Sequence, residues 1–318
     1  MTTTILIMSW DEAHLLRHSL PRATAEEAHV VVIDNACTDD TARIIAEHGA
    51  ERLHLAERLS YCEALNRAMG QTGGEAVLLL NADCFLEPGF LSAALPHLED
   101  RTVGSVAPRL LRTLGPSAED RLDAIDAAGL VVDRRRKNTL VGHGRPALAY
   151  DRPGEAFGAD GAAALYRRAT LEHCALDGEL FDPDMERWAS DVDVAWRART
   201  LGWRCVYEPL SMAYHVRTYS PSTRGRMPAR DRRMQFRNRY LMMVKNDTRG
   251  ALARDLPALV AYELGALAYI LAFERELLGG YRDAARLLGR ARSRRRQLGD
   301  RRRVAGSPPA PLGLEPAP

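Results

Sequence analysis

Apolar runs and amphipathic segments alternate along the first hundred residues. The apolar runs are rich in Ile, Val and Leu, and they predict strands at residues 5–8, 29–33, 52–55 and 76–80. The segments between them carry apolar residues at helical spacing, and they predict helices at residues 11–20, 38–48, 61–69 and 88–98. Apolar strands that alternate with helices indicate a parallel sheet covered on both faces. This part of the chain is therefore predicted to be α/β.

The pattern is less regular after residue 104. A helix is predicted over residues 190–201, where Gly202 ends it, and a strand is predicted over residues 203–207. From about residue 249 onward, leucines recur at spacings of three or four and predict helical structure. The last residues, 304–318, are rich in Pro and Ala, and we expect them to be disordered.

Composition and charge narrow the class of protein. The chain of 318 residues is 46% hydrophobic and 27% charged, which fits a globular protein and excludes a wholly disordered one. The formal net charge is only +2, but residues 282–303 hold ten Arg against two Asp. A basic segment of this kind suggests an anionic surface, either a membrane or a nucleic acid. The apolar stretch before it contains Pro257 and Glu263, which favours a buried or interfacial helix over a membrane span.

The cysteines point to a reducing compartment. There are five of them, an odd number, and no two stand in a C-x-x-C spacing. This argues against a disulfide framework and against a zinc site. Residues 1–5 show neither a basic segment nor a long apolar one, so we expect no signal peptide and a cytoplasmic protein.

Acidic and amide side chains follow two of the predicted strands. Asp34 ends the second strand, and Asn81 and Asp83 follow the fourth. In parallel sheets ligands bind at the carboxyl ends of the strands. Carboxylates there can bind a nucleoside or hold a divalent cation that bridges a diphosphate. The chain has neither G-x-G-x-x-G after the first strand nor a P-loop motif. The alternative is that Asp34 and Asp83 are ordinary turn residues or helix caps.

A second group of carboxylates lies at the start of the predicted helix 190–201. Ser190 and Asp193 have the spacing of a capping box, in which Asp193 binds the backbone. Asp191 is then free to face a cleft, and a carboxylate at a helix N-terminus is kept ionised, as a general base requires. The alternative is that both carboxylates only cap the helix.

Two further features could bind a cation or a phosphate. His215 follows a predicted strand and could ligate a cation, although a lone histidine is more often structural. Residues 224–239 hold seven Arg, which suit phosphate oxygens. The alternatives are a solvated basic face or a nucleic-acid surface, but the stretch shows no recognised nucleic-acid-binding motif.

Taken together, these segments resemble glycosyltransferase family 2, and within it the rhamnosyltransferase-like group. Residues 31–39 are similar to V-V-V-D-N-x-S-x-D, and residues 78–83 are similar to L-L-L-N-P-D, a form of the D-x-D metal motif. Residues 191–197 with Gly202 and Trp203 are similar to E-D-x-D-L-x-W-R…G-W, residues 64–68 are similar to the stretch before the metal motif, and His215 follows at the usual interval. The resemblance covers roughly residues 3–245.

The resemblance implies the GT-A fold, which is α/β and Rossmann-like, with a mostly parallel sheet flanked by helices and here a C-terminal helical extension. Residues 1–105 are then the nucleotide-sugar-binding half and residues 106–245 the acceptor-binding half with the catalytic base. Residues 246–303 form an amphipathic, basic, membrane-associating extension before the disordered tail.

The resemblance also implies roles for single residues. Asp191 is the general base that deprotonates the acceptor hydroxyl. The metal, Mg²⁺ or Mn²⁺, is held by Asp83 and His215. The nucleotide is expected to contact Ser9, Glu12, Asp34, Asn66 and Asn81. The diphosphate or the acceptor is expected to contact Arg217, Arg224, Arg226 and Asp193.

The implied activity is that of an inverting, metal-dependent glycosyltransferase. Its donor is a nucleotide sugar, dTDP-rhamnose or a UDP-sugar, and its acceptor is a cell-surface glycan or a polyprenyl-linked sugar. It is expected at the inner face of the cytoplasmic membrane, with a homodimer possible. Asn81 and Ser190 replace carboxylates of the family pattern. A catalytically weak, membrane-tethered binding protein is therefore the alternative, while a nucleotidyltransferase and a nucleic-acid-binding protein are less favoured.

Overall fold

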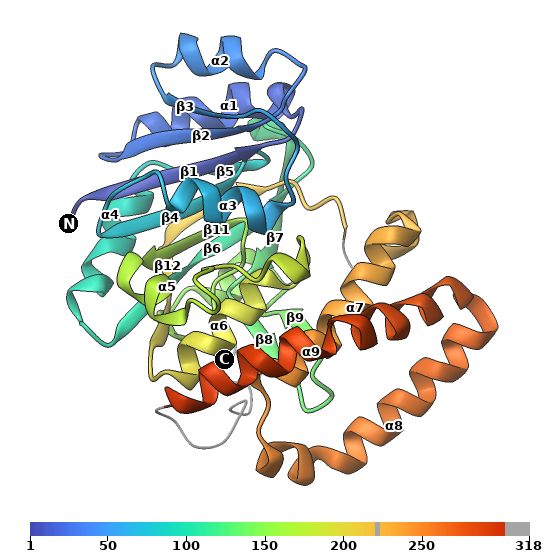
Figure 1. The fold of residues 1–318 in the computed structure, drawn as a ribbon. Helices are drawn as coiled ribbons and strands as arrows, with labels where there is room; N and C mark the ends of the chain where they lie inside the picture. The colour runs from blue at the N-terminus through green and yellow to red at the C-terminus, as the bar shows by residue number, and fades with distance from the viewer. Residues whose placement is uncertain (220–222, 303–318) are drawn as a thin grey trace.

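The computed structural model describes residues 1–219 and 223–302, so the tail expected to be disordered lies outside the described residues. A ten-stranded mixed sheet forms the body, and three long helices extend from it (Figure 1). The strands of this sheet are β1 Thr3–Ser9, β2 His29–Asn35, β3 Glu51–Leu55, β4 Ala76–Asn81, β5 Cys84–Leu86, β6 Val103–Thr113, β7 Arg121–Ala127, β10 Gly154–Ala156, β11 Ala163–Arg167 and β12 Arg204–His215. A separate hairpin pairs β8 Leu130–Val132 with β9 Asn138–Leu140.

The helices alternate with the strands as the sequence predicts. The α-helices are α1 Ala13–Thr24, α2 Thr41–Glu47, α3 Tyr61–Met69, α4 Phe90–Ala94, α5 Arg168–Cys174, α6 Ser190–Thr200, α7 Ala229–Asn246, α8 Arg249–Phe273 and α9 Leu278–Asp300. The helix predicted from residue 38 begins three residues later. Thr38 cannot start it because its N–H and hydroxyl both bind the Asp11 carboxylate across the neighbouring loop.

The strand order confirms the α/β prediction. Strands β3, β2, β1 and β4 pair in parallel in that order. Strand β11 then runs antiparallel between β4 and β6, so the sheet as a whole is mixed. Strand β6 crosses the border predicted at residues 105 and 106, and the two predicted halves therefore share one continuous sheet.

Both faces of the sheet are buried along β1, β2 and β4, which explains why the middle of each of these strands is apolar. Along β1, Ile5 and Ile7 pack toward α1, α2 and α4, while Leu6 and Met8 pack toward α3, α5 and α6. Successive strand residues point to opposite faces. Since each face carries its own hydrophobic cluster, the middle of β1 is apolar, between the two buried threonines that begin the strand and Ser9, which ends it.

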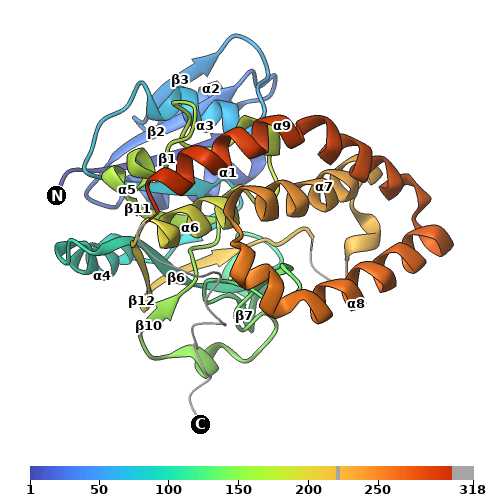
Figure 2. The ribbon, with the colours of Figure 1, turned by 60° about the horizontal axis from the view of Figure 1, so that its bottom comes forward.

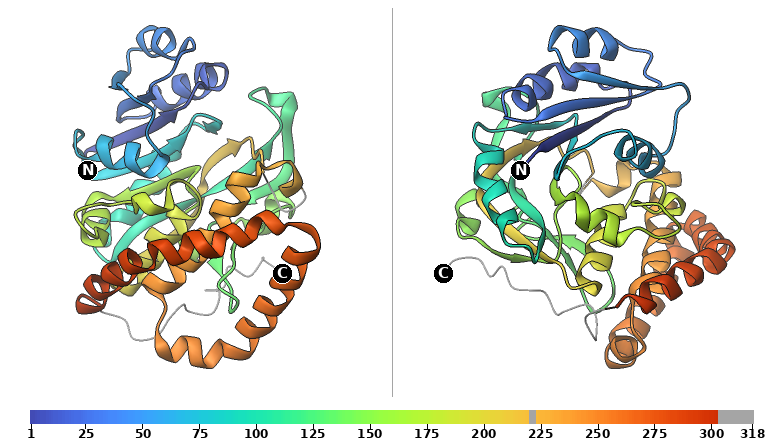
Figure 3. Two further views of the ribbon diagram at one scale, coloured as in Figure 1. Left: turned by 45° about the vertical axis from the view of Figure 1, so that its right-hand side comes forward. Right: turned by 60° about the vertical axis from the view of Figure 1, so that its left-hand side comes forward.

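The C-terminal helices form an arm. Helices α7 and α9 lie side by side against the body, and α8 stands away from it (Figures 2 and 3). Helix α8 is long and apolar enough to cross a membrane by length and composition, with a mean hydropathy of 1.7 over its most apolar 18 residues. Five of its large apolar side chains form an exposed stripe: Leu256, Val260, Leu264, Leu267 and Leu271.

Much of the basic charge on α9 is used within the protein. Arg294 is buried and binds Asp177, Asp182 and Asp184 of the body, while Arg301 donates to the backbone carbonyls of residues 173 and 175. Residues 282–302 therefore bind α9 to the body of the protein in part through their arginines. Their sequence does not reveal this role.

Candidate active site

A cleft of about 1030 Å³ opens at the carboxyl ends of β1 and β4 and reaches as far as α8. The sheet contributes Trp10, Asn81 and Asp83 to its wall, and the opposite wall is the loop that ends in Asp191. The carboxyl edge of a parallel sheet is the place where α/β proteins bind ligands. The polarity of the strands therefore predicted the location of this cleft correctly.

A chain of charged groups crosses the floor of the cleft. His215 Nε2 lies 3.4 Å from Asp83 Oδ1, and His215 Nδ1 lies 2.8 Å from Asp126 Oδ2. Arg217 then bridges Asp126 Oδ1, at 2.7 Å, and Asp160 Oδ2, at 2.9 Å. The side chain of Asp126 is fully buried. Burial opposes its ionisation, but His215 and Arg217 hold the pKa of Asp126 well below its usual range.

Asp83 and His215 fit the ligand set of a divalent cation such as Mn²⁺. Metal-binding histidines usually give their second ring nitrogen to a carboxylate, which fixes the ring and its tautomer. Asp126 has this position, because it binds Nδ1 and leaves Nε2 facing Asp83. Asn81 lines the same wall of the cleft. Sequence analysis proposed Asp83 and His215 as ligands but missed Asp126, which lies in β7, a strand that also carries Arg121 and Asp123 and so gives no clear signal.

Asp191 faces the cleft from the first turn of α6. Its Oδ2 accepts a hydrogen bond from the Gly161 N–H at 3.1 Å, and its Oδ1 accepts one from the Val192 N–H at 2.8 Å. Burial and the negative charge of Asp160 nevertheless raise the pKa of the Asp191 carboxyl to about 6. Such a carboxylate is ionised at neutral pH and is more basic than an ordinary aspartate, which suits a general base.

The loop before Asp191 is strained and is clamped by α7. Glu186 and Ala189 have left-handed backbone angles, with φ of 59° and 61°. Such angles cost a residue other than glycine roughly 1–2 kcal/mol. The Asn238 side chain binds the carbonyls of residues 185 and 188, and Arg237 binds the carbonyl of Asp184. We infer that these contacts hold the loop, and with it Asp191, in place.

The predicted capping box at the start of α6 is wrong. The residue that caps this helix is Ala189, and the Ser190 hydroxyl donates to the carbonyl of Arg187. Asp193 is fully buried, where Arg197 Nε, Lys245 Nζ and the Asn246 amide lie around its two oxygens. Removing one partner of such a buried ion pair is strongly destabilising, because it leaves an uncompensated charge. Asp193 is therefore a structural ion that ties α6 to α7, and it touches neither the helix backbone nor the cleft.

Three residues expected at the nucleotide are placed elsewhere in the described chain. Ser9 is buried and shares a hydrogen bond with Thr41. The Asn66 amide binds the backbone of residue 181. Asp34 is 1% exposed and pairs with Arg52 and His54. Although burial alone would raise it, hydrogen bonds from the Cys37 N–H and Arg52 lower the pKa of Asp34. None of the three belongs to the wall of the cleft formed by the described residues.

Glu12 and Trp10 do line the cleft on the side of the sheet. Burial, together with the nearby charge of Asp83, raises the pKa of Glu12 to about 7. Trp10 is 38% exposed and lies under the Arg58 guanidinium, whose central carbon is 5.2 Å from the ring centre. An exposed aromatic ring beside the metal ligands can stack on a nucleobase. Sequence reasoning predicted Glu12 but assigned no role to Trp10.

The predicted arginines are mostly paired with carboxylates. Arg217 forms ion pairs with Asp126 and Asp160, and Arg224 forms one with Glu274. Arg226 is exposed and is not part of the described wall of the cleft. By contrast, Arg187 lines the cleft, is exposed, and has no carboxylate partner within the described residues. Its positive charge acts to lower the pKa of Glu12, against the larger effect of burial. Sequence analysis overlooked this residue.

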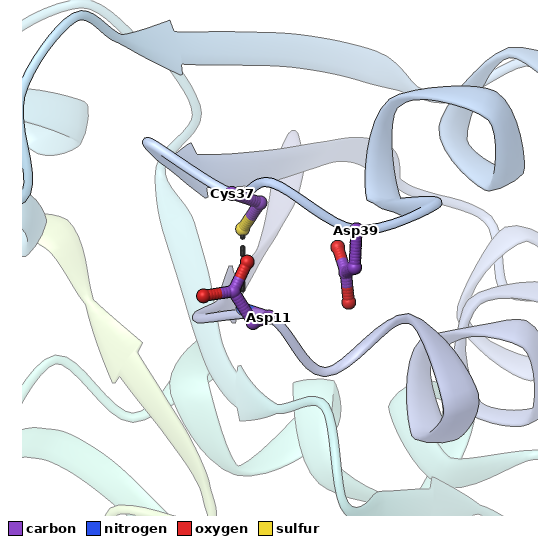
Figure 4. Close-up of side chains that lie close together, drawn as sticks. All are labelled: Asp11, Cys37 and Asp39. Carbon is purple, nitrogen blue, oxygen red and sulfur yellow. Dashed lines mark hydrogen bonds between the residues drawn. The ribbon is translucent and has the colours of Figure 1, made fainter.

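A second cluster of ligand-type atoms lies behind the cleft, where β1 and β2 end. It consists of Asp11, Cys37 and Asp39, whose ligand atoms lie within 4.8 Å of one another (Figure 4). Their acceptors are already occupied: Asp11 binds the Thr38 N–H and Arg58, and Asp39 binds the N–H groups of residues 13 and 41. This cluster is therefore a junction between two loops.

Comparison with known proteins gives a family and a fold. Residues 4–174 match the family model described as Glycosyl transferase family 2. Poly-beta-1,6-N-acetyl-D-glucosamine synthase from Staphylococcus aureus strain COL is 23% identical over 223 residues, which are 66% of this chain and 49% of that protein. The chain thus spans about half the length of the curated relatives it matches.

Solved structures share the fold at low sequence identity. Residues 1–349 of TarS from S. aureus superpose with a TM-score of 0.59 at 15% identity, covering 95% of this chain and 83% of that one. A mannosyltransferase from Pyrobaculum calidifontis, in complex with GDP-Man and Mn²⁺, superposes with a TM-score of 0.50 at 20% identity, covering 90% and 75%. These likenesses confirm the predicted GT-A architecture.

Proposed function

The chain belongs to glycosyltransferase family 2, whose model covers more than half of it, and we propose that it transfers a sugar from a nucleotide sugar to a hydroxyl group. The observation that carries the proposal is the shared cleft. The cleft is lined both by Asp191, a carboxylate with a raised pKa, and by the carboxylate–histidine pair of Asp83 and His215. Such a cleft can deprotonate an acceptor and bind a diphosphate through a cation at the same time.

Each substrate has a side of the cleft in this proposal. Trp10 and Glu12 receive the base and ribose, and Asp83 with His215 would hold a divalent cation, which would supply positive charge to the leaving diphosphate. Arg187 supplies a second positive charge, because Arg217 is already neutralised by two carboxylates. Asp191 takes the proton from the acceptor hydroxyl. A single base that activates direct attack gives inversion at the anomeric carbon.

The donor is best identified by titration. The resemblance favours dTDP-rhamnose, whereas similar structures hold GDP-Man or UDP-GlcNAc. We expect one of dTDP, UDP and GDP to bind with a clear preference, and to do so only when Mn²⁺ is present. Isothermal titration of each nucleotide with and without Mn²⁺ measures this. A folded protein that binds none of the three would overturn the proposal.

The rate should depend on pH through Asp191. Burial and Asp160 raise the pKa of this carboxyl to about 6, so protonation below pH 6 removes the base. We expect kcat/KM for sugar transfer to fall about tenfold per pH unit below pH 6. An acid limb near pH 4, the range of an unperturbed aspartate, would contradict this reading of the site.

We also propose that the protein lies on the cytoplasmic membrane through the exposed stripe of α8. All five side chains of the stripe are between 39% and 65% exposed. Residues 256–273 carry one charged side chain, Glu263, and it turns to the body, where it binds Arg239 and Tyr240. An apolar stripe without charges is suited to the interface of a bilayer.

Co-sedimentation with vesicles of phosphatidylcholine and phosphatidylglycerol tests this placement. We expect the double variant Leu264→Asp, Leu267→Asp to lower the bound fraction tenfold or more, because each leucine contributes roughly 1.5–3 kcal/mol when buried. The control is Leu210→Asp, since Leu210 is 74% exposed and adjoins Ser211, which binds α4 on the opposite side of the molecule from α8 (Figure 2). Equal binding of the wild type and both variants would show that the stripe does not meet the lipid.

A further inference from the structure

His143 is a side chain of the cleft wall to which the proposed function assigns no role. It lies in a turn at residues 142–145, which follows β9. The side chain is 19% exposed, so it is partly buried and still open to the cleft. Other residues account for the nucleobase, the cation and the diphosphate. This imidazole is therefore left for another part of a substrate.

The backbone holds this turn against β7. The Gly144 N–H donates to the carbonyl of Ile125 at 2.8 Å, and the Ile125 N–H donates to the carbonyl of Arg145 at the same distance. The Arg145 N–H closes the turn by donating to the carbonyl of Gly142 at 2.8 Å. The glycines on either side of the histidine have φ of 71° and 78°, a left-handed conformation that favours glycine. A turn that is bonded in this way presents His143 to the cleft in a fixed position.

The ring of His143 is oriented by Asp126. His143 Nδ1 lies 2.8 Å from the backbone carbonyl oxygen of Asp126. Because a carbonyl oxygen only accepts hydrogen bonds, Nδ1 carries the hydrogen atom and donates it. In the neutral ring Nε2 is then an acceptor, and no described residue bonds to it. His143 therefore brings to the cleft an acceptor nitrogen that the described part of the protein does not use.

Asp126 also connects His143 to the expected cation site. His143 Nδ1 lies 3.6 Å from Asp126 Oδ1, and His215 Nδ1 lies 2.8 Å from Asp126 Oδ2. The two imidazoles thus lie beside the same buried carboxylate, and His215 faces Asp83. Among the described residues, the cluster behind the cleft is the only group of three ligand-type side chains within 4.8 Å of one another. His143 does not complete such a group with Asp83 and His215, so its Nε2 is available to a substrate group beside the cation.

We propose that His143 binds the sugar that is transferred, with Nε2 accepting a hydrogen bond from one of its hydroxyl groups. This inference rests on the proposed function and adds a contact to the donor sugar. The diphosphate oxygens of a nucleotide sugar only accept hydrogen bonds, so the lone pair of Nε2 does not bind them. The sugar attached to the diphosphate has the O–H donors that fit. A site that bonds a substrate hydroxyl rejects analogues that lack it, so His143 contributes to the choice of donor sugar.

Titration of nucleotide sugars and of free nucleoside diphosphates tests this contact. The probes are dTDP-rhamnose, UDP-GlcNAc and GDP-mannose, each compared with its own nucleoside diphosphate, with Mn²⁺ and without an acceptor. In His143→Asn the side-chain amide can still donate to the carbonyl of Asp126, but nothing replaces Nε2. The matched control is His18→Asn, the same substitution at an exposed histidine of α1 outside the described wall of the cleft. Thermal unfolding verifies that both variants are folded.

For the nucleotide sugar that the wild type binds best, we expect His143→Asn to raise the Kd about tenfold, because a bound hydroxyl loses its acceptor. The Kd of the matching nucleoside diphosphate should change by less than about threefold, and His18→Asn should match the wild type for both ligands. An unchanged Kd for the nucleotide sugar would overturn the proposal, and so would an equal loss for both ligands. A folded wild type that binds none of the probes would refute the proposed function as well, so the two failures can be told apart.

Deoxy analogues of the same nucleotide sugar identify the hydroxyl. One analogue should bind the wild type about tenfold more weakly than the parent sugar does, yet bind His143→Asn as well as the parent does. If every analogue lost the same affinity in the wild type and in His143→Asn, then His143 would bond none of these hydroxyls and the proposal would fail.

Discussion

Asp191→Asn should reduce sugar transfer by roughly 10²–10⁴-fold while nucleotide binding stays within about threefold of the wild type. Asparagine has the same shape, and its Oδ1 can still accept from a backbone N–H, as the carboxylate does from residues 161 and 192. It cannot accept a proton from the acceptor. The effect is measured as the rate at which nucleoside diphosphate is released when donor and acceptor are both present.

Asp151→Asn is the control for this prediction. It makes the same substitution at an exposed aspartate that is not part of the described wall of the cleft. Its rate should equal that of the wild type. Transfer at the wild-type rate by Asp191→Asn would remove Asp191 from the chemistry. A wild-type protein that binds nucleotide but releases no product would instead favour the alternative of a catalytically weak binding protein.

Asp83→Ala should lower the affinity for the nucleotide in the presence of Mn²⁺ by 100-fold or more. Loss of a residue that only supports a metal ligand typically costs about 10–100-fold, and Asp83 is expected to be a ligand itself. Without it, His215 keeps its partner Asp126 but has lost the carboxylate that faces Nε2. Thermal unfolding should change little, because the Asp83 side chain is 18% exposed at the edge of the cleft. Titration of the nucleotide with and without Mn²⁺ measures the loss.

The matched control is Asp39→Asn in the cluster behind the cleft. The amide oxygen can still accept from the Ala13 N–H, so this hydrogen bond between the two loops is kept while the charge and the bond from the Thr41 N–H are removed. We expect its nucleotide affinity to change by less than about threefold. If Asp39→Asn abolished metal-dependent binding and Asp83→Ala did not, the cation would belong to the Asp11–Cys37–Asp39 cluster.

The sequence by itself determined the α/β architecture and the edge of the sheet where the site lies. Apolar strands that alternate with helices have one way to bury both faces, and their polarity brings the ends of β1 and β4 to one rim. Asp83, Asp191 and His215 were candidates for this reason, and the resemblance to glycosyltransferase family 2 gave them their expected roles. Each of these residues lies at the end of a strand or at the start of a helix. The position of such an end is set by the local pattern of apolar and polar residues.

The tertiary structure alone decided which charged side chains stay available. Asp126 and Arg217 lie 91 residues apart in sequence, and Lys245 and Asp182 lie 63 apart, yet each pair is in contact. The periodicity of apolar residues within a helix or strand shows which side of it is buried. It does not show which residue of another element will pair with a buried charged side chain. Asp193 was therefore misread as a helix cap. Likewise, Arg224, Arg232 and Arg239 are paired only because the tertiary structure brings them to Glu274, Glu276 and Glu263, in parts of the chain whose local patterns are independent.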